Sequence, residues 1–446
     1  MINSARPTAR SRFRRAALIL ALAMGGCARY TPLPLSTAAP LPAQLPASET
    51  LHGPLTAGQV VTLALANNPD LKAARLKRGI AAGQSTQAGI LANPSLSGAL
   101  LPLLSGAGTV SAWNLGITQD IKNIITYRSR KREAKANERQ IDADIVWQEW
   151  QVAGQARQIA TDLIIGARNR ESYLAAYQLL AGRNARLERA LAARSVTLVT
   201  AAPDRVPLQS ARTALDALDQ QQLALMHQLD ALLGLAPDVV VPLAAQPDLP
   251  AFDPAEIRAQ IATLPDRRPD LLALRMGYAA ADEQLRQAVQ SQFPDLILGG
   301  SVASDNSRVI NGGPNVQVGL PIFDRGQGNI AIARATREQL HADYDARLAA
   351  AVGTAGALLR EYEQLSAQLA IARRDLPAAR LAATRAQAAF GASNLDERGY
   401  VDLVSNRSAK EQEIMTLELA LLDRQIAVQT LVGAGLPAVD LTVGAK

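Results

Sequence analysis

The chain has 446 residues, of which 48% are hydrophobic, 19% charged and only 4% aromatic. This composition excludes a disordered chain and a surface of aromatic residues for stacking nucleic-acid bases, and it favours long, closely packed helices. The net charge of +6 comes almost wholly from five arginines within residues 1–26, which contain no acid. The charge therefore reflects a leader segment and does not indicate nucleic-acid binding.

Residues 1–26 have the pattern of a signal peptide. Basic residues precede Ala16–Met24, an apolar core of nine residues. This core is too short to span a bilayer as a helix, which takes about 20 residues. It stops at Gly25 and Gly26, just before Cys27, the only cysteine. We therefore expect an exported protein without an internal disulfide.

The segment Met24–Cys27 resembles the lipobox of bacterial lipoproteins. The resemblance implies cleavage before Cys27 and acylation at that residue, with palmitate among the attached chains. Ala28 after the cysteine implies, in the same way, sorting to the outer membrane. Ordinary cleavage after Ala23, with Cys27 unmodified, is the alternative. Residues 27–54 carry six prolines, so we expect them to form an extended tether behind the anchor.

The rest of the chain is predicted to contain two copies of one unit. A shift of 200 residues pairs Pro69-Asp70-Leu71 with Pro269-Asp270-Leu271, and 11 of the 28 residues from 69 to 96 are identical to their partners. Chance would give roughly two or three identities. Glycine followed by proline, a helix stop, closes each copy. We expect a first repeat at 55–235, an extended linker at 236–254, a second repeat at 255–435 and a C-terminal tail at 436–446.

Each copy is expected to fold as a helix, two strands, a long helix and a shorter returning helix. Trp113, Leu115 and Ile117 alternate with polar or small residues, the period of a strand with one apolar face. Apolar residues then recur every seven positions, the spacing of a coiled coil. The elements predicted for the first copy are a helix from Thr56 to about Leu91, strands at Ser95–Leu101 and Ala112–Gln119, a long helix from about Ile124 to Val196 and a shorter one at about Leu208–Leu233.

The second copy is predicted to repeat this order. We expect strands at Leu296–Ser304 and Asn315–Pro321 with a turn at Asn311–Pro314 between them, a long helix from Gly328 to about Ala392 and a shorter one at about Tyr400–Val432. Long helices of about 65 to 73 residues would extend for roughly 100 Å. The two short helices of each unit sum to nearly that length, so we expect them to stack end to end beside the long one.

No motif indicates catalysis or a cofactor. Gly326, Gly328 and Ala331 resemble part of a dinucleotide-binding fingerprint. A Rossmann unit, however, needs a helix of normal length and then a parallel strand, whereas the helix predicted here is far longer. The three histidines lack the spacing of metal ligands. We therefore expect no enzyme activity, no cofactor, no metal site and no nucleic-acid partner.

The strands require partners. Four strands with one apolar face cannot close on themselves, whereas three chains would supply twelve, enough for a barrel in a membrane. Leu65–Leu71, Pro321–Asn329 and the two Leu-Gly-Leu-like ends of the repeats resemble the TolC family of outer-membrane efflux channels. Within this family, Pro321–Asn329 is most similar to the heavy-metal cation branch.

The resemblance implies a mainly α fold with a small β part. Three chains would form a homotrimer in which four strands per chain build a twelve-stranded transmembrane β-barrel. The duplicated long helices would form a coiled-coil tunnel that extends into the periplasm. The resemblance also implies docking to a periplasmic adaptor (membrane fusion) protein and to an inner-membrane transporter.

The turns at the ends of the two long helices are the candidate functional sites. In a trimer, an acid that faces the axis becomes a ring of three carboxylates, which favours cations and resists closure unless arginine pairs with it. TolC-like channels have acidic constrictions there. The candidates for this gate are Asp402, Asp396 and Glu397, with Asp402 preferred because it is expected inside the returning helix. A solvated helix turn is the alternative.

The same turns are candidate contacts for the adaptor, because exposed ends of helical hairpins can pack against a partner's hairpin. A plain connection between helices is the competing interpretation, and the two are compatible. The residues proposed for this contact are Val196, Asp204, Arg205, Leu395 and Arg398.

The leading hypothesis is a passive, lipid-anchored exit channel in the outer membrane that carries drugs or metal cations and is powered by its partner transporter. A periplasmic coiled-coil scaffold lipoprotein without a pore is the alternative from a different class, and a type I secretion duct is an alternative within the same class. An adaptor subunit would instead carry a single long hairpin flanked by lipoyl-like β-domains. Conductance in planar bilayers separates a channel from a scaffold.

Overall fold

The computed structural model divides the chain into two compact units, residues 1–41 and 42–446. In the first unit the described residues, 30–38 and 41, form neither helix nor strand and are exposed to solvent. The predicted signal peptide and Cys27 lie outside the described part of the chain. The structure describes residues 30–38, 41–44, 53–237, 239–437 and 439.

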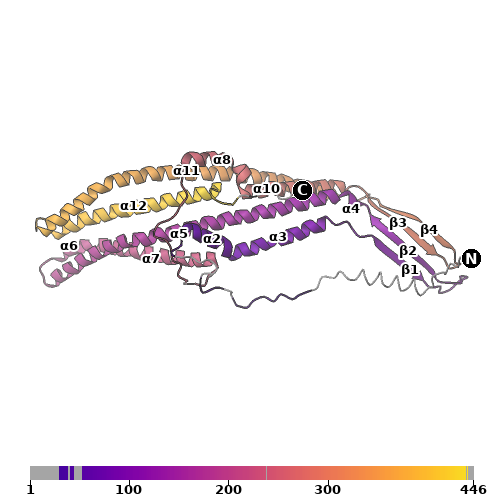
Figure 1. The fold of residues 1–446 in the computed structure, drawn as a ribbon, viewed down its shortest axis with the longest axis horizontal. Coiled ribbons are helices and arrows are strands. Elements are labelled where there is room, and N and C mark those ends of the chain that lie inside the picture. The colour runs from indigo at the N-terminus through magenta and orange to yellow at the C-terminus, as the bar shows by residue number, and fades with distance from the viewer. Residues whose placement is uncertain (1–29, 39–40, 45–52, 238, 438, 440–446) are drawn as a thin grey trace, which may run out of the picture. The chain divides into compact units, whose positions relative to one another are not determined.

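The second unit contains the helices and strands, in an order that occurs twice along the chain (Figure 1). The first set is α2 (Ala57–Asn67), α3 (Pro69–Ala88), β1 (Ser95–Leu101), β2 (Ala112–Asp120), α4 (Lys122–Ile125), α5 (Tyr127–Ala192), α6 (Leu198–Ala201), η1 (Ala202–Asp204) and α7 (Arg205–Leu233). The second set is α8 (Pro254–Ala262), α9 (Leu264–Arg267), α10 (Pro269–Gln290), β3 (Asp295–Ser304), β4 (Ile310–Gly319), α11 (Gln327–Gly391) and α12 (Glu397–Val432).

The single helix predicted from Thr56 to Leu91 is in fact two helices that meet at Asn68. The Asn68 side chain accepts a hydrogen bond from the backbone N–H of Leu71 at 2.9 Å, which caps α3. Its amide also donates to the carbonyl oxygen of Leu232, at 2.9 Å. Pro69 then occupies the first turn of α3, where no backbone donor is needed. At this break, the hydrogen bond from Asn68 to Leu232 therefore connects the start of α3 to the end of α7.

The short helices lie along the long ones, as the sequence predicts. Helix α5 has 66 residues and α11 has 65, so each extends for roughly 100 Å. Helices α2, α3 and α7 all pack along α5, and α10 and α12 pack along both long helices. At the ends of α7 and α12, Gly234 and Gly433 adopt left-handed φ angles of 67° and 74°, the conformation that ends a helix at least cost with glycine.

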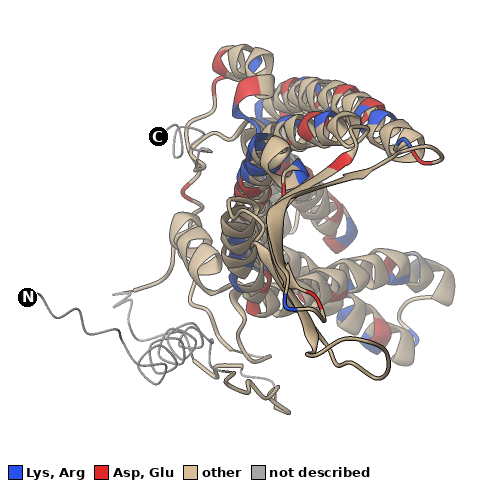
Figure 2. Ribbon diagram, turned by 90° about the vertical axis from the view of Figure 1, so that its right-hand side faces the viewer, with Lys and Arg blue, Asp and Glu red and all other residues tan. Residues whose placement is uncertain are grey.

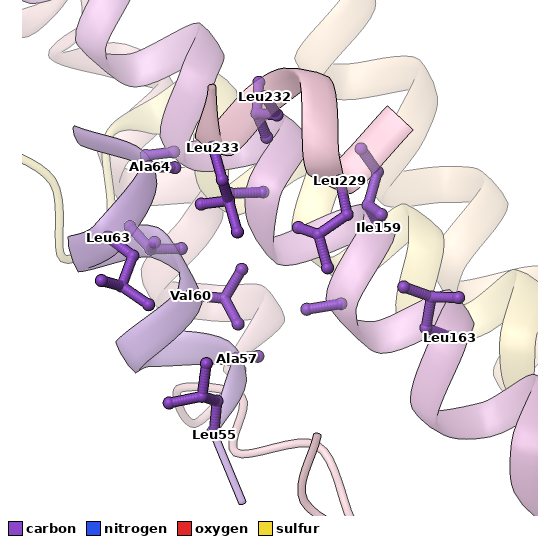
Figure 3. Close-up of a cluster of buried hydrophobic side chains, with 14 of the residues drawn as sticks. Leu55, Ala57, Val60, Leu63, Ala64, Ile159, Leu163, Leu229, Leu232 and Leu233 are labelled. Atoms are coloured by element: carbon purple, nitrogen blue, oxygen red, sulfur yellow. The ribbon is translucent and has the colours of Figure 1, made fainter. Parts of the chain in front are cut away.

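A buried cluster fixes the middle of the first repeat (Figure 3). Val60 and Leu63 from α2 meet Ile159 from α5 and Leu229 and Leu233 from α7. Each fully buried leucine, valine or isoleucine side chain contributes about 1.5–3 kcal/mol relative to an exposed one. The residues in this cluster are far apart in sequence, so the cluster holds the joint between the short helices against the continuous long helix.

The four strands form one antiparallel sheet in the order β1-β2-β3-β4. The turn predicted at Asn311–Pro314 is wrong, because these residues belong to β4. The turn lies at residues 305–309, where the Asp305 carboxylate accepts hydrogen bonds from the backbone N–H groups of Ser307 and Val309 at 2.8 and 2.9 Å. Pro314 lies in β4, an edge strand of the described sheet, and edge strands accept proline more readily than central strands do.

Within the described part of the chain, the structure contains no helix with a stretch long and apolar enough to cross a membrane.

Candidate functional site

The sheet has one apolar and one polar face. Residues directly opposite each other in the register share a face, and successive residues along a strand alternate between faces. The pairs Leu96–Ile117, Ile117–Gly300 and Leu298–Val316 therefore place the apolar side chains on one side. The residues on this face include Leu96, Leu100, Trp113, Leu115, Ile117, Leu298, Val302, Val316 and Val318, and all of these are exposed in the single chain.

The opposite face carries mostly small and polar side chains, with Leu101 and Ile297 as its larger apolar members. It includes Ser97, Asn114, Thr118, Ser301, Asn311, Asn315 and Gln317. The charged residues within the strands are Asp120 and Asp295 alone, at the ends of β2 and β3 next to the helices. In Figure 2 the strands accordingly are almost entirely tan, and Lys, Arg, Asp and Glu concentrate on the helices. The sheet could thus face lipid on one side and water on the other.

Aromatic residues mark both ends of the apolar face. Trp113 is near the loop end of β2 and is 38% exposed. Phe293 and Phe323 flank the helix ends of β3 and β4 and are 63% and 92% exposed. Aromatic girdles of this kind lie at the two interfaces of a membrane in outer-membrane proteins. These residues therefore define candidate boundaries of a hydrophobic band.

At the other end of the second unit, two tips connect the long helices to their returning helices (Figure 1). The first tip is residues 193–204 and the second is residues 392–396. Both returning helices begin earlier than predicted. Helix α7 begins at Arg205 instead of about Leu208, and α12 begins at Glu397 instead of about Tyr400. Phe390 and Tyr400 stack at 4.9 Å between ring centroids beside the second tip.

The three predicted gate acids have three different surroundings. Asp396 caps α12, where its carboxylate accepts a hydrogen bond from the Gly399 N–H at 3.0 Å. Glu397 forms an ion pair with Arg186 of α5, at 2.6 Å. Asp402 lies inside α12, with a side chain that is 66% exposed and 3.8 Å from Arg398. Asp402 thus has an exposed carboxylate that neither caps a helix nor links the two hairpins.

Two arginines of α5 connect the tips, and the sequence analysis missed both. The side chain of Arg183 is only 6% exposed and forms an ion pair with Asp204 of the first tip at 2.9 Å. It also donates to the backbone carbonyl of Glu397, at 3.3 Å. Together with Arg186, it joins the α5–α7 hairpin to the α11–α12 hairpin. Their spacing of three residues on one helix face was the available signal.

The residues predicted to contact an adaptor are only partly accessible. Arg205 and Arg398 are exposed, Val196 and Leu395 are half-buried, and the Asp204 carboxylate is occupied by Arg183. The first tip and the start of α7 also present apolar side chains that the sequence pattern did not single out. These are Leu198, Val199 and Val206, which are 58%, 84% and 69% exposed.

A pair of carboxyl groups lies between α5 and α12, away from the tips. Burial, and then the neighbouring charge of Asp423, raise the pKa of Asp162 to about 7. Burial also raises the pKa of Asp423. Gln158 donates a hydrogen bond to Asp423, and its amide is 3.4 Å from Asp162. A shared proton therefore favours contact between these two helices.

Among the described residues, no three His, Cys, Asp or Glu side chains come together as a metal site would require.

Comparison with known proteins agrees with this architecture. Residues 261–434 match the family model described as outer membrane efflux protein. No curated protein matches the sequence significantly. Three solved structures with closely similar folds are the CmeC outer membrane channel of Campylobacter jejuni, the outer membrane protein VceC of Vibrio cholerae and the MtrE outer membrane channel of Neisseria gonorrhoeae.

These similarities extend over most of each chain. CmeC has a TM-score of 0.68 at 17% identity, covering 92% of this chain and 94% of CmeC. VceC has a TM-score of 0.61 at 20% identity, covering 83% of this chain and 95% of VceC. MtrE has a TM-score of 0.63 at 16% identity, covering 92% of this chain and 98% of MtrE. The second repeat thus matches the outer membrane efflux protein family, and the whole chain shares the fold of solved outer-membrane channels, in agreement with the sequence resemblance to the TolC family.

Proposed function

We propose that three copies of this chain form the outer-membrane exit channel of a tripartite efflux pump. The main support for this proposal is the sheet, because its edge strands β1 and β4 have no partner within the described chain and its apolar face is exposed. Pairing β4 of one copy with β1 of the next would close twelve strands into a barrel. Closure would place the apolar face toward lipid and the polar face toward the lumen.

The helices provide the second part of the channel. Helices of roughly 100 Å could line a tunnel that continues from the barrel into the periplasm. The match of residues 261–434 to the outer membrane efflux protein family supports this role, since that family consists of channels rather than enzymes. Movement through the channel is passive and is driven by an inner-membrane transporter, to which the tips connect through a periplasmic adaptor. The cargo is a small drug or a metal cation.

The tips form the gate in this proposal. The links from Arg183 and Arg186 to Glu397 hold the two hairpins of one chain together, while Asp402 supplies the accessible carboxylate for a ring of three acids. Leu198, Val199 and the exposed arginines Arg205 and Arg398 offer the adaptor an apolar surface with a basic border.

Conductance and oligomeric state together test the channel. Purified protein should have the mass of a trimer in detergent and should produce discrete conductance steps in planar lipid bilayers. A scaffold without a pore would give no steps, and a stable monomer in native membranes would refute the proposal. As a matched pair, Leu115→Lys on the apolar face should abolish insertion, whereas Asn114→Lys on the polar face should leave the trimer intact and change its ion selectivity.

The lipid anchor is a separate proposal, supported by the sequence alone. Acylation at Cys27 would fix the N-terminus to the membrane that the strands cross. Metabolic labelling with a palmitate analogue should label the wild-type protein and not Cys27→Ser. Persistent labelling of the variant would exclude this residue as the acylated one.

A further inference from the structure

A stripe of basic residues follows the sheet directly. Its members are Arg128, Lys131, Arg132, Lys135 and Arg139, which are spaced by three, one, three and four residues on α5 and therefore lie on one side of that helix. Together with Met276, Ala279 and Glu283 of α10 they line a groove of about 660 Å³. We call these five residues the basic stripe and the cavity the α5–α10 groove.

The positive charge of the basic stripe is largely uncompensated. Arg132 lies 3.6 Å from Glu283, which also contacts Arg286. The other four members make no ion pair or side-chain hydrogen bond with any residue that the structure describes. The Nε atom of Arg139 is buried without a hydrogen-bond partner. A buried, unsatisfied guanidinium donor is costly, so the groove is electrostatically suited to an anion.

The second repeat shows that the fold does not require this stripe. Helices α5 and α11 both follow the second strand of their repeat and begin 200 residues apart, at Tyr127 and Gln327. At the same offset, the five basic residues correspond to residues that carry no charge. They are Gly328, Ala331, Ile332, Ala335 and Gln339. A long helix that follows a strand in this position thus forms without basic residues, and the stripe is a property of the first repeat alone.

The position of the groove narrows the choice of ligand. Arg128 is eight residues beyond Asp120, the end of β2, and the stripe continues for about 16 Å along the helix. One turn beyond Arg139, Ala143 forms a buried cluster with Leu272 and Ala273 of α10, and Val439 packs against this cluster. The groove thus lies directly beneath the strands, on the face of α5 and α10 that carries the C-terminal segment at Val439.

The groove also stays open when chains associate through their edges. Helix α5 packs between α3 on one side and α10 on the other, both from the same chain. A neighbouring copy that pairs with β1 and β4 would approach α3 and α11. The α5–α10 groove lies between these edges, so assembly need not cover it.

We propose that the α5–α10 groove binds the headgroup of an anionic phospholipid in the leaflet that faces the periplasm. The inference rests on the proposed function, because it takes the helix end of the sheet as the boundary of the membrane. The guanidinium and ammonium groups of the basic stripe pair with the lipid phosphate. Tyr127, Met276 and Ala279 contact the glycerol and the first part of the acyl chains.

The test compares two triple variants in nanodiscs of phosphatidylcholine with or without phosphatidylglycerol. The first, Arg128→Gln/Lys131→Gln/Lys135→Gln, removes most of the basic stripe. The control, Lys72→Gln/Arg360→Gln/Arg385→Gln, removes the same charge from exposed residues elsewhere that form no ion pair in the described chain. Native mass spectrometry counts the phosphatidylglycerol molecules retained by each trimer, and circular dichroism checks the helix content.

Wild-type protein and the control should retain phosphatidylglycerol, and the stripe variant should lose affinity by about fivefold for each of the three basic residues removed, hence about a hundredfold in total. Excess inorganic phosphate should not displace the lipid, since it lacks acyl chains. Displacement by phosphate would assign the groove to a free anion and overturn the proposal. Equal retention by wild type and the stripe variant would overturn it as well.

Conductance measured on the same preparations separates the two proposals. If the stripe variant is trimeric and conducts but retains as much lipid as wild type, the lipid inference alone fails. If wild-type protein neither assembles nor conducts, the proposed function fails.

Discussion

Replacing Glu397 by glutamine removes the ion pair that joins the two helical hairpins, at almost constant side-chain volume. The pair with Arg186 is partly solvated, with side chains 50% and 30% exposed, so its loss costs about 1 kcal/mol per chain. If the three tips of a trimer open together, the costs add to about 3 kcal/mol, and the ratio of closed to open channels falls about a hundredfold. The hydrogen bond from Arg183 to the Glu397 backbone remains.

Single-channel recording measures this change directly. Glu397→Gln should raise the open probability or the mean conductance. High salt should raise the same quantity in the wild type toward the value of the variant, because salt screens the ion pair between Arg186 and Glu397. Glu413→Gln is the matched control, since Glu413 pairs only with Lys410 of its own helix. Conductance of Glu397→Gln equal to that of the control would show that this contact does not hold the tips closed.

Three further results are expected. The pKa of Asp162 is about 7 in the folded state, above its ordinary value of 3.8. Between pH 3.8 and pH 7, Asp162 therefore keeps its proton in the folded state and has lost it in the unfolded state. Stability should therefore be greatest at low pH within this window and should fall as pH rises through 7, and Asp423→Asn should flatten this part of a melting-temperature profile relative to wild type. Asp402→Ala should weaken cation preference in reversal-potential measurements, and unchanged selectivity would remove Asp402 from the gate. Gly433→Ala should lower stability by about 2 kcal/mol or more in chemical denaturation, because its φ of 74° is left-handed and an added Cβ would meet the buried indole of Trp150.

The sequence predicted the architecture well where local pattern and packing agree. The alternation of Trp113, Leu115 and Ile117 located β2 and its apolar face, and the heptad spacing located α5. Both patterns repeat over many residues, so the element remains recognisable even where a single residue departs from the pattern.

Local capping chemistry explains the errors in the predicted elements. Asn68 ends one helix and starts another because its side chain bonds Leu71 and Leu232 at once, and the second bond spans 164 residues. In the second hairpin, Asp305 closes the turn through two backbone donors and Arg308 takes a left-handed φ of 68°. The glycines and proline of Asn311–Pro314 gave a stronger turn signal, but they occupy an edge strand.

The polar contacts between helices could not be predicted from one repeat at a time. Asp162 and Asp423 meet across 261 positions of sequence, and Arg186 meets Glu397 across 211. Each acid alone is typical of a solvated helix face. Their roles emerge only when α5 is placed beside α12, which requires the tertiary packing of both repeats.

The joint at Asn68 gives the helical part of the molecule unequal stiffness. Along α5 the backbone is continuous, whereas its companion column is interrupted halfway, where the start of α3 meets the end of α7. Bending should therefore concentrate at that level, so that the half below it can splay without disturbing the half attached to the strands. In the proposed channel, such a division would let the tips respond to a partner while the barrel stays sealed, and a rigid crosslink across the interruption would freeze the lower half.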